Sequence, residues 1–113
     1  MHARQLHSWD VTTTQAIDLQ RRLANDVITS GGPTPNDGID EIQTIAGVDL
    51  SQPDPETGLV RGAAVVLTFP DLEVVEVSTA HGIPRFPYVP GLLSFREAPA
   101  LIEALASLTV TPD

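Results

Sequence analysis

The sequence predicts a small α/β domain in which a helix precedes, and a second helix follows, a three-stranded, mostly antiparallel sheet. Three observations predict this class: a capping signal and helical apolar spacing near the start, three short apolar segments between residues 42 and 80, and an apolar stripe at residues 98–108. The 113 residues, 42% of them hydrophobic, suffice for one domain with one core. Only 4% are aromatic, so Val, Leu, Ile and Ala must fill most of that core.

The first helix is predicted from a capping box. Thr12 is the expected N-cap, and Gln15 stands three residues later, where its side chain can reach back to the cap. Apolar residues then recur at helical spacing at Ala16, Leu19, Leu23 and Val27. The helix is expected to end near Thr29, because "SGGPTPNDG" is rich in helix-breaking residues.

Three strands are predicted at residues 42–50, 62–69 and 72–80. The second is an almost continuous apolar run, which is typical of a strand covered on both faces. The Pro70-Asp71 turn makes the second and third strands antiparallel neighbours. Alternation places one set of third-strand residues on one face (Leu72, Val74, Glu76) and another set on the other (Glu73, Val75, Val77), and the glutamates indicate an edge strand.

A proline- and glycine-rich loop at residues 81–93 leads to the second helix, expected at residues 98–108. Pro99 suits the first turn of a helix, but Ala98 would then be a poor cap. A start at Ser94 would form a capping box with Glu97 and would leave Pro99 inside the helix. Both placements leave the Glu97 carboxylate near a helix N-terminus. No strand follows this helix, so the strand at 42–50 is expected to have a free edge or a partner outside this chain.

Composition limits the possible functions. The absence of cysteine excludes disulfide scaffolds, cysteine-bound zinc and thiol nucleophiles. The net charge of −9, with six arginines as the only basic residues, disfavours a basic nucleic-acid face and is compatible with a cation site. Neither a signal-peptide core nor an apolar run of ~20 residues occurs, so a cytoplasmic location is the default expectation.

Two positions stand out on physical grounds. Asp49 lies in an apolar strand, where a charge costs several kcal/mol unless it is paired, hydrogen-bonded or bound to metal. The alternative is that it caps the turn formed with Ser51 and Gln52. Tyr88 stands between Pro87 and Pro90, and a stiff loop that presents an aromatic ring suits a wedge between stacked bases. The alternative is that Tyr88 folds back over the sheet. The three histidines, His2, His7 and His81, share no metal-binding spacing.

Four segments resemble the endonuclease V family of deoxyinosine-directed DNA repair nucleases: "SWDVTTTQAIDLQRRLANDVI", "AGVDLS", "AAVVLTFPDLEVVE" and "FPYVPGLLSFREAPALIEAL". The similarity runs almost from end to end, and residues 1–113 look like the N-terminal part of a single endonuclease V domain. The resemblance implies a ribonuclease H-like fold and hydrolysis of a phosphodiester near deoxyinosine with Mg²⁺, for which Mn²⁺ could substitute.

The resemblance also implies roles for matching positions. Asp49 and Glu97 resemble the catalytic carboxylates that bind the metal, and the strand-separating wedge matches Pro87, Tyr88, Val89, Pro90 and Gly91. The implied partner is DNA that contains deoxyinosine or mismatches, with no membrane involved. Family members continue with a strand ending in Asp-Gly and with a later Lys and His, none of which maps here, so this chain alone is expected to be inactive. The alternatives are a non-catalytic remnant and a small interaction module that dimerises through its open strand edge.

Overall fold

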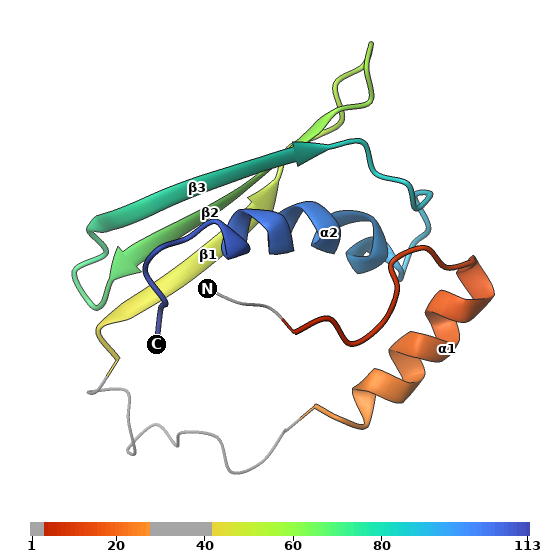
Figure 1. Cartoon of the computed structure of the whole chain (residues 1–113), viewed down its shortest axis with the longest axis horizontal. Helices are drawn as coiled ribbons and strands as arrows, with labels where there is room; N and C mark the ends of the chain where they lie inside the picture. Colours follow the sequence, from red (N-terminus) through yellow and green to blue (C-terminus); the bar gives the residue numbers. More distant parts are fainter. Residues whose placement is uncertain (1–3, 28–41) are drawn as a thin grey trace.

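The computed structural model describes residues 4–27 and 42–113. Along the chain lie α1 (Thr13–Ala24), β1 (Thr44–Leu50), β2 (Val60–Thr68), β3 (Val74–Gly82) and α2 (Leu93–Ala106). The strands form one antiparallel sheet in the order β1-β2-β3 (Figure 1). The predicted class and the predicted order of elements are therefore confirmed. In the described ranges neither helix could cross a bilayer, since the longer one, α2, has 14 residues where ~20 are needed.

The first helix begins as predicted. Thr12 is the N-cap, its hydroxyl accepts from the Gln15 N–H at 3.2 Å, and the Gln15 side chain accepts from the Thr12 N–H at 2.8 Å. The helix ends at Ala24, with Asn25 as C-cap, which is earlier than predicted. Val27 therefore lies outside the helix and is exposed, and Thr29 lies outside the described residues.

The second helix also differs from the prediction, because it begins at Leu93 and not at residue 98. Its N-cap is Leu92, whose side chain makes no capping bond, so the Ser94 box does not form. The start is fixed by packing instead, since Leu92 and Phe95 are both buried. Pro99 lies inside the helix and lacks the N–H that would bond to the Phe95 carbonyl.

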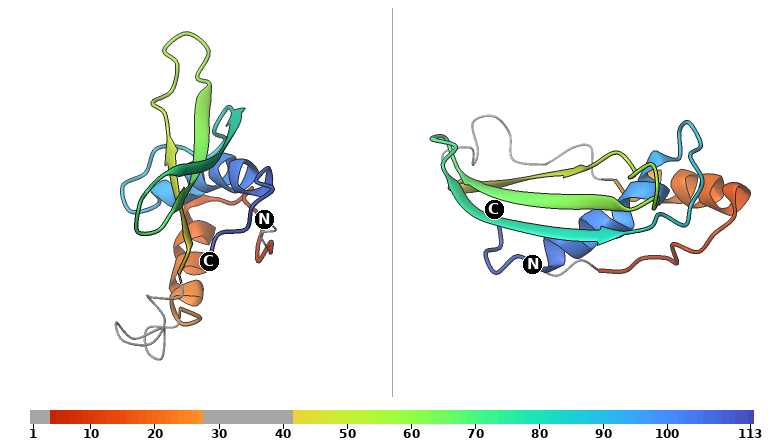
Figure 2. Two further views of the ribbon diagram at one scale, coloured as in Figure 1. Left: turned by 90° about the vertical axis from the view of Figure 1, so that its left-hand side faces the viewer. Right: turned by 90° about the horizontal axis from the view of Figure 1, so that it is seen from above.

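In residues 4–27 and 42–113, the sheet is covered on one face only (Figure 2). Its α2-facing side comprises Val60, Gly62, Ala64 and Val66 of β2, all buried. The other side of β2 presents Ala63, Val65 and Leu67, which are half-buried, and Figure 2 shows no described helix against it. The prediction that β2 is covered on both faces is therefore wrong for the described residues, because α1 lies beyond the end of the sheet, beside the start of α2 (Figure 1).

The predicted alternation along β3 is interrupted by a bulge. Glu76 pairs with Val66 and Val74 pairs with Leu67, so Val75 is the extra residue. Because directly paired residues share a face, Glu76 lies on the α2 side and Val74 on the opposite side, not together as predicted. β2 and β3 are joined by residues 69–73, and β3 is an edge strand as predicted.

The chain after α2 is held against both edge strands by carboxylates. Glu76 on β3 accepts hydrogen bonds from the Thr109 N–H at 3.0 Å and the Val110 N–H at 2.8 Å. Asp113 accepts from the Gln43 and Thr44 N–H groups at the start of β1, both at 3.1 Å. The Thr109 N–H, followed by that of Val110, lowers the pKa of Glu76 below its ordinary value. The Gln43 N–H, followed by that of Thr44, lowers the pKa of Asp113 in the same way. The segment therefore crosses the sheet from β3 to β1.

Candidate metal and wedge site

Asp49 is the sixth residue of β1 and its side chain is exposed. Its Oδ1 accepts from the N–H of Leu50 at 2.8 Å, and the described residues offer its Oδ2 no hydrogen-bond partner. Ser51 instead donates to the Gln52 carbonyl at 3.0 Å and accepts from the Arg61 N–H at 2.9 Å. Asp49 therefore does not form the predicted cap with Ser51 and Gln52, and one carboxylate oxygen is available to a ligand.

Glu97 is the fifth residue of α2. It is one turn before Leu101, whose side chain is near the Gly62 backbone, and it continues the helix stripe of Leu101, Ala104 and Leu108 toward the sheet. The side chain is half-buried, and no hydrogen bond or ion pair involves its carboxylate in the described part of the chain. A half-buried carboxylate without a protein partner is an unfavourable arrangement unless it binds a cation or water.

The two carboxylates meet the sheet from different sides. Asp49 pairs with Ala63, so it belongs to the face away from α2, whereas Leu50 pairs with Gly62 on the α2 face. Asp49 is nevertheless the last residue but one of β1, and α2 begins to the right of and below the β1 arrowhead in Figure 1. A shared cation would therefore lie at the end of the strand, and not over the middle of either face.

The loop at residues 86–92, which carries the predicted wedge, is anchored by buried residues that alternate with exposed ones. Phe86 and Leu92 are 5% and 4% exposed, and Val89 between them packs against the same cluster, which includes Ala16 and Leu19 of α1. The Leu92 N–H donates to the Val89 carbonyl at 3.0 Å, closing the loop. The function of α1 in this fold is therefore to support the loop from behind.

Tyr88 projects from this anchored loop and is 72% exposed, with Pro87, Pro90 and Gly91 also exposed. Gly91 has φ = 85°, which a glycine adopts without strain. The alternative in which Tyr88 covers the sheet is therefore wrong. Two buried anchors and two prolines hold the backbone while the ring faces solvent, an arrangement that could insert an aromatic ring between bases.

Arg96 joins the loop to α2, a contact that sequence reasoning missed. Its Nη1 donates to the Phe86 carbonyl at 2.8 Å, immediately before Pro87. Arg96 is also the neighbour of Glu97, so the same helical turn holds the loop and the candidate metal carboxylate. The sequence hinted at this bond only by placing Arg96 next to Glu97 in "SFRE". Adjacent residues of a helix do not face each other, so Arg96 had to bond elsewhere.

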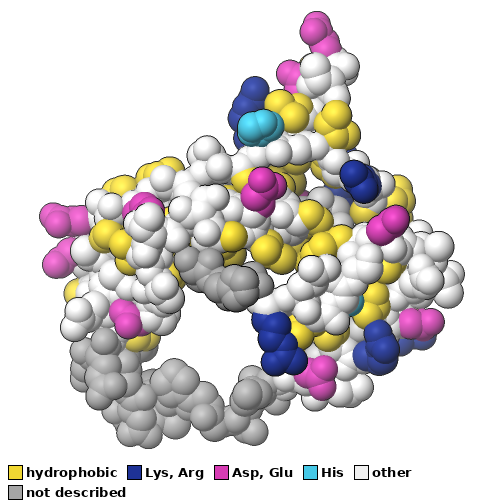
Figure 3. Space-filling model, viewed as in Figure 1, with side chains coloured by type: hydrophobic (Ala, Val, Ile, Leu, Met, Phe, Trp, Pro, Cys, Tyr) yellow, Lys and Arg dark blue, Asp and Glu magenta, His cyan; other side chains and the backbone are white. Residues whose placement is uncertain are grey.

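The charged residues described near this site provide neither a third metal ligand nor a basic patch. No group of three or more His, Asp or Glu residues that could hold a metal occurs among the described residues, so Asp49 and Glu97 would form an incomplete ligand set. Acidic side chains surround the face shown in Figure 3, and its arginines are spread out and do not form a basic patch. Residues 37–41 of the acid-rich run lie outside the described residues.

The chain is similar in sequence to a known protein family. The sequence matches the family described as Endonuclease V over residues 22–113. Endonuclease V from Gloeobacter violaceus is 42% identical over 109 residues, which are 96% of this chain and 42% of that protein. The chain therefore spans less than half the length of this relative.

Solved structures give the same result. The crystal structure of endonuclease V from Streptomyces avermitilis matches with a TM-score of 0.80 and 39% identity, over 93% of this chain and 44% of that one. Endonuclease V from Ciona intestinalis, crystallised with a 24mer DNA containing an inosine followed by a ribo-adenosine, matches with a TM-score of 0.71 and 24% identity over 82% of this chain and 38% of that one, which shows the fold alone. The ribonuclease H-like class is thereby confirmed, and the chain belongs to the endonuclease V family.

Proposed function

We propose that this chain supplies the wedge and two metal-binding carboxylates of an endonuclease V, a nuclease that hydrolyses a phosphodiester near deoxyinosine in DNA. The single observation that carries the proposal is Glu97, a half-buried carboxylate without a partner among the described residues, on the same helical turn as the arginine that holds the wedge loop. Family membership supports the assignment of the reaction.

The residues present suit Mg²⁺ or Mn²⁺. Both ions prefer hard oxygen ligands, and Mg²⁺ usually keeps several waters while using one or two protein carboxylates. Asp49 Oδ2 and the Glu97 carboxylate are the oxygens that would hold it. When bound, such an ion activates a water and stabilises the leaving oxygen of a phosphodiester. The Tyr88 ring would fill the gap that a flipped-out base leaves in the stack. The buried side chains of Phe86 and Leu92 would hold the loop backbone in place while the ring inserts.

The metal site can be tested on this chain by Mn²⁺ titration, with electron paramagnetic resonance to follow the free ion. We expect Asp49→Asn and Glu97→Gln each to weaken the tightest binding by about tenfold or more, since each removes one of two charged ligands. Asp71→Asn, in the exposed β2–β3 connection, is the matched control for lost negative charge. Equal affinities in all four proteins would refute the site.

Catalysis is a separate question, because the chain covers only 42% of the length of the Gloeobacter relative. With two carboxylates and no lysine, we expect no nicking of an inosine-containing duplex above the level of an Asp49→Ala control. The full-length Streptomyces enzyme, run beside it in Mg²⁺, shows that the substrate is competent. Robust cleavage by this chain would prove that it contains a complete ligand set.

A further inference from the structure

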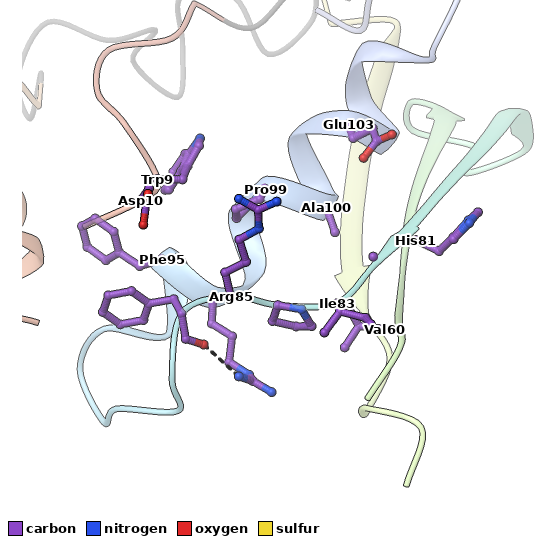
Figure 4. Close-up of a pocket in the computed structure, with 14 residues that line it drawn as sticks. Trp9, Asp10, Val60, His81, Ile83, Arg85, Phe95, Pro99, Ala100 and Glu103 are labelled. Atoms are coloured by element: carbon purple, nitrogen blue, oxygen red, sulfur yellow. Dashed lines mark hydrogen bonds between the residues drawn. The ribbon is translucent and has the colours of Figure 1, made fainter. Parts of the chain in front are cut away.

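A cavity of about 280 Å³ lies between α2, the N-terminal segment and the chain leaving β3 (Figure 4). Its α2 lining consists of Phe95, Arg96, Pro99, Ala100 and Glu103, and Glu97 is not part of it. The cavity is therefore separate from the candidate metal site. Its volume is near the lower end of the ~300–1,000 Å³ typical of small-ligand sites, so it suits a ligand of about one nucleotide.

The cavity contains an unpaired cation. Figure 4 shows the Arg85 side chain reaching along α2 toward Pro99, and the described residues provide its guanidinium with neither an ion pair nor a hydrogen bond. The second guanidinium, Arg96, already donates to the Phe86 carbonyl. Arg85 is thus free to donate to an oxyanion, and a guanidinium matches the geometry of a phosphate.

The rest of the lining favours a nucleotide over a simple anion. Trp9 and Phe95 lie edge to face, with ring centroids 6.0 Å apart, and give the cavity an aromatic wall. Asp10 and Glu103 add two carboxylates and His81 an imidazole. Carboxylates disfavour a small free anion but accept hydrogen bonds from the amino groups of bases. The half-buried Trp9 ring, a phosphate donor and base-edge acceptors together match one unstacked nucleotide.

We propose that this cavity, the Arg85 pocket, binds one nucleotide of the single strand that the wedge separates. Arg85 is three residues before Tyr88, so the pocket opens at the base of the wedge loop. A strand displaced by Tyr88 toward this side would meet Arg85. The proposal rests on the proposed function, since an unstacked strand reaches the pocket only beside a working wedge.

The chain's only tryptophan provides the test. Trp9 lines the pocket, so its emission reports occupancy. We expect a saturable change in emission on titration with deoxyadenosine 5′-monophosphate and with a short single-stranded DNA, both in EDTA without metal. Arg85→Gln is expected to weaken binding by about tenfold or more, because a charge-assisted hydrogen bond is lost. Arg21→Gln, an exposed arginine on α1, is the matched control and should bind like the parent.

The outcomes separate the possibilities. An absent saturable change, or an equal loss in Arg21→Gln, would overturn the pocket. Inorganic phosphate binding as well as the nucleotide would overturn the role of the base, and binding of the mononucleotide without the strand would overturn the role in DNA. These titrations contain no metal, so failure of the metal site and failure of the pocket give different results. Circular dichroism of each variant checks that the fold is intact.

Discussion

Gly62 sets the distance between the sheet and α2, and replacing it with alanine should move that helix. A Cβ at this position would lie 3.2 Å from the Ala100 carbonyl oxygen and 3.5 Å from a methyl group of Leu101. The first contact involves helix backbone, so it cannot be relieved by rotating a side chain. Ser78 restrains the helix further along, because its hydroxyl donates to the Ala104 carbonyl.

The expected magnitude follows from two opposing effects. Overpacking a buried contact costs ~1–3 kcal/mol, whereas Gly→Ala stabilises by ~0.4–1 kcal/mol through the unfolded chain. The net effect of Gly62→Ala is therefore a loss of about 1 kcal/mol in the free energy of unfolding, or a Tm lower by about 4 °C for a domain of this size. Gly47→Ala is the matched control. It lies in β1 with no atom within 4 Å of the added Cβ, so only the stabilising effect remains.

Thermal and urea unfolding, followed by circular dichroism, measure both variants. We expect Gly62→Ala below the parent and Gly47→Ala equal to it or higher. A Gly62→Ala variant as stable as Gly47→Ala would show that α2 accommodates the methyl group without cost, and the close approach of helix and strand would then not restrain the turn that carries Glu97.

Three further predictions concern the loop and the chain after α2. Glu76→Gln should lower Tm at pH 7. The hydrogen bonds that lower the pKa of Glu76 favour its ionised form in the folded state, so they stabilise the fold at a pH above the ordinary pKa of glutamate. That stabilisation is lost as the pH falls below about 5 through the lowered value, so the difference in Tm should vanish in acid; a constant difference would contradict it. Tyr88→Ala should leave Tm unchanged but abolish the brightening of a 2-aminopurine placed beside inosine, whereas Phe86→Ala should cost about 3 kcal/mol of stability. Arg96→Met should speed amide exchange in residues 86–91 without changing exchange in β2, and unchanged loop exchange would show that the bond to Phe86 is not restraining.

The sequence predicted an element's boundary well where that boundary depends on interactions between residues close together in the chain. The Thr12 capping box specified the start of α1, because both hydrogen bonds join residues three apart. The start of α2 could not be found this way. Ser94 and Pro99 both offered local starts, but the buried side chains of Leu92 and Phe95 fix the actual one, and they meet α1, about 75 residues earlier in the chain.

The candidate site shows the same division. A charged residue in an apolar strand and an aromatic residue between prolines marked Asp49 and Tyr88, because each is unusual in its own segment. Arg96, Glu76 and Asp113 were not predicted, since each bonds to backbone that is distant in the sequence or in another element. Only the resemblance to a family implied a metal-binding role for Glu97, because the local sequence explained this residue equally well as part of a capping box.

The free edge of β1 is less open than the sequence suggests. The Ser51 N–H donates to the Arg61 carbonyl and the Gln43 carbonyl accepts from the Phe69 N–H, so the alternate N–H groups of β1 point outward, those of Thr44, Ala46, Val48 and Leu50. Carboxylates already accept hydrogen bonds from the first and the last of these N–H groups: Asp113 accepts from Thr44, and Asp49 accepts from Leu50. A second copy pairing antiparallel through the middle of this edge would bring the Asp49 end of one chain against the Asp113 end of the other. Like charges facing each other across strands are destabilising, so the edge disfavours a twofold dimer. A strand without acids at its ends, running parallel to β1, would meet no such repulsion.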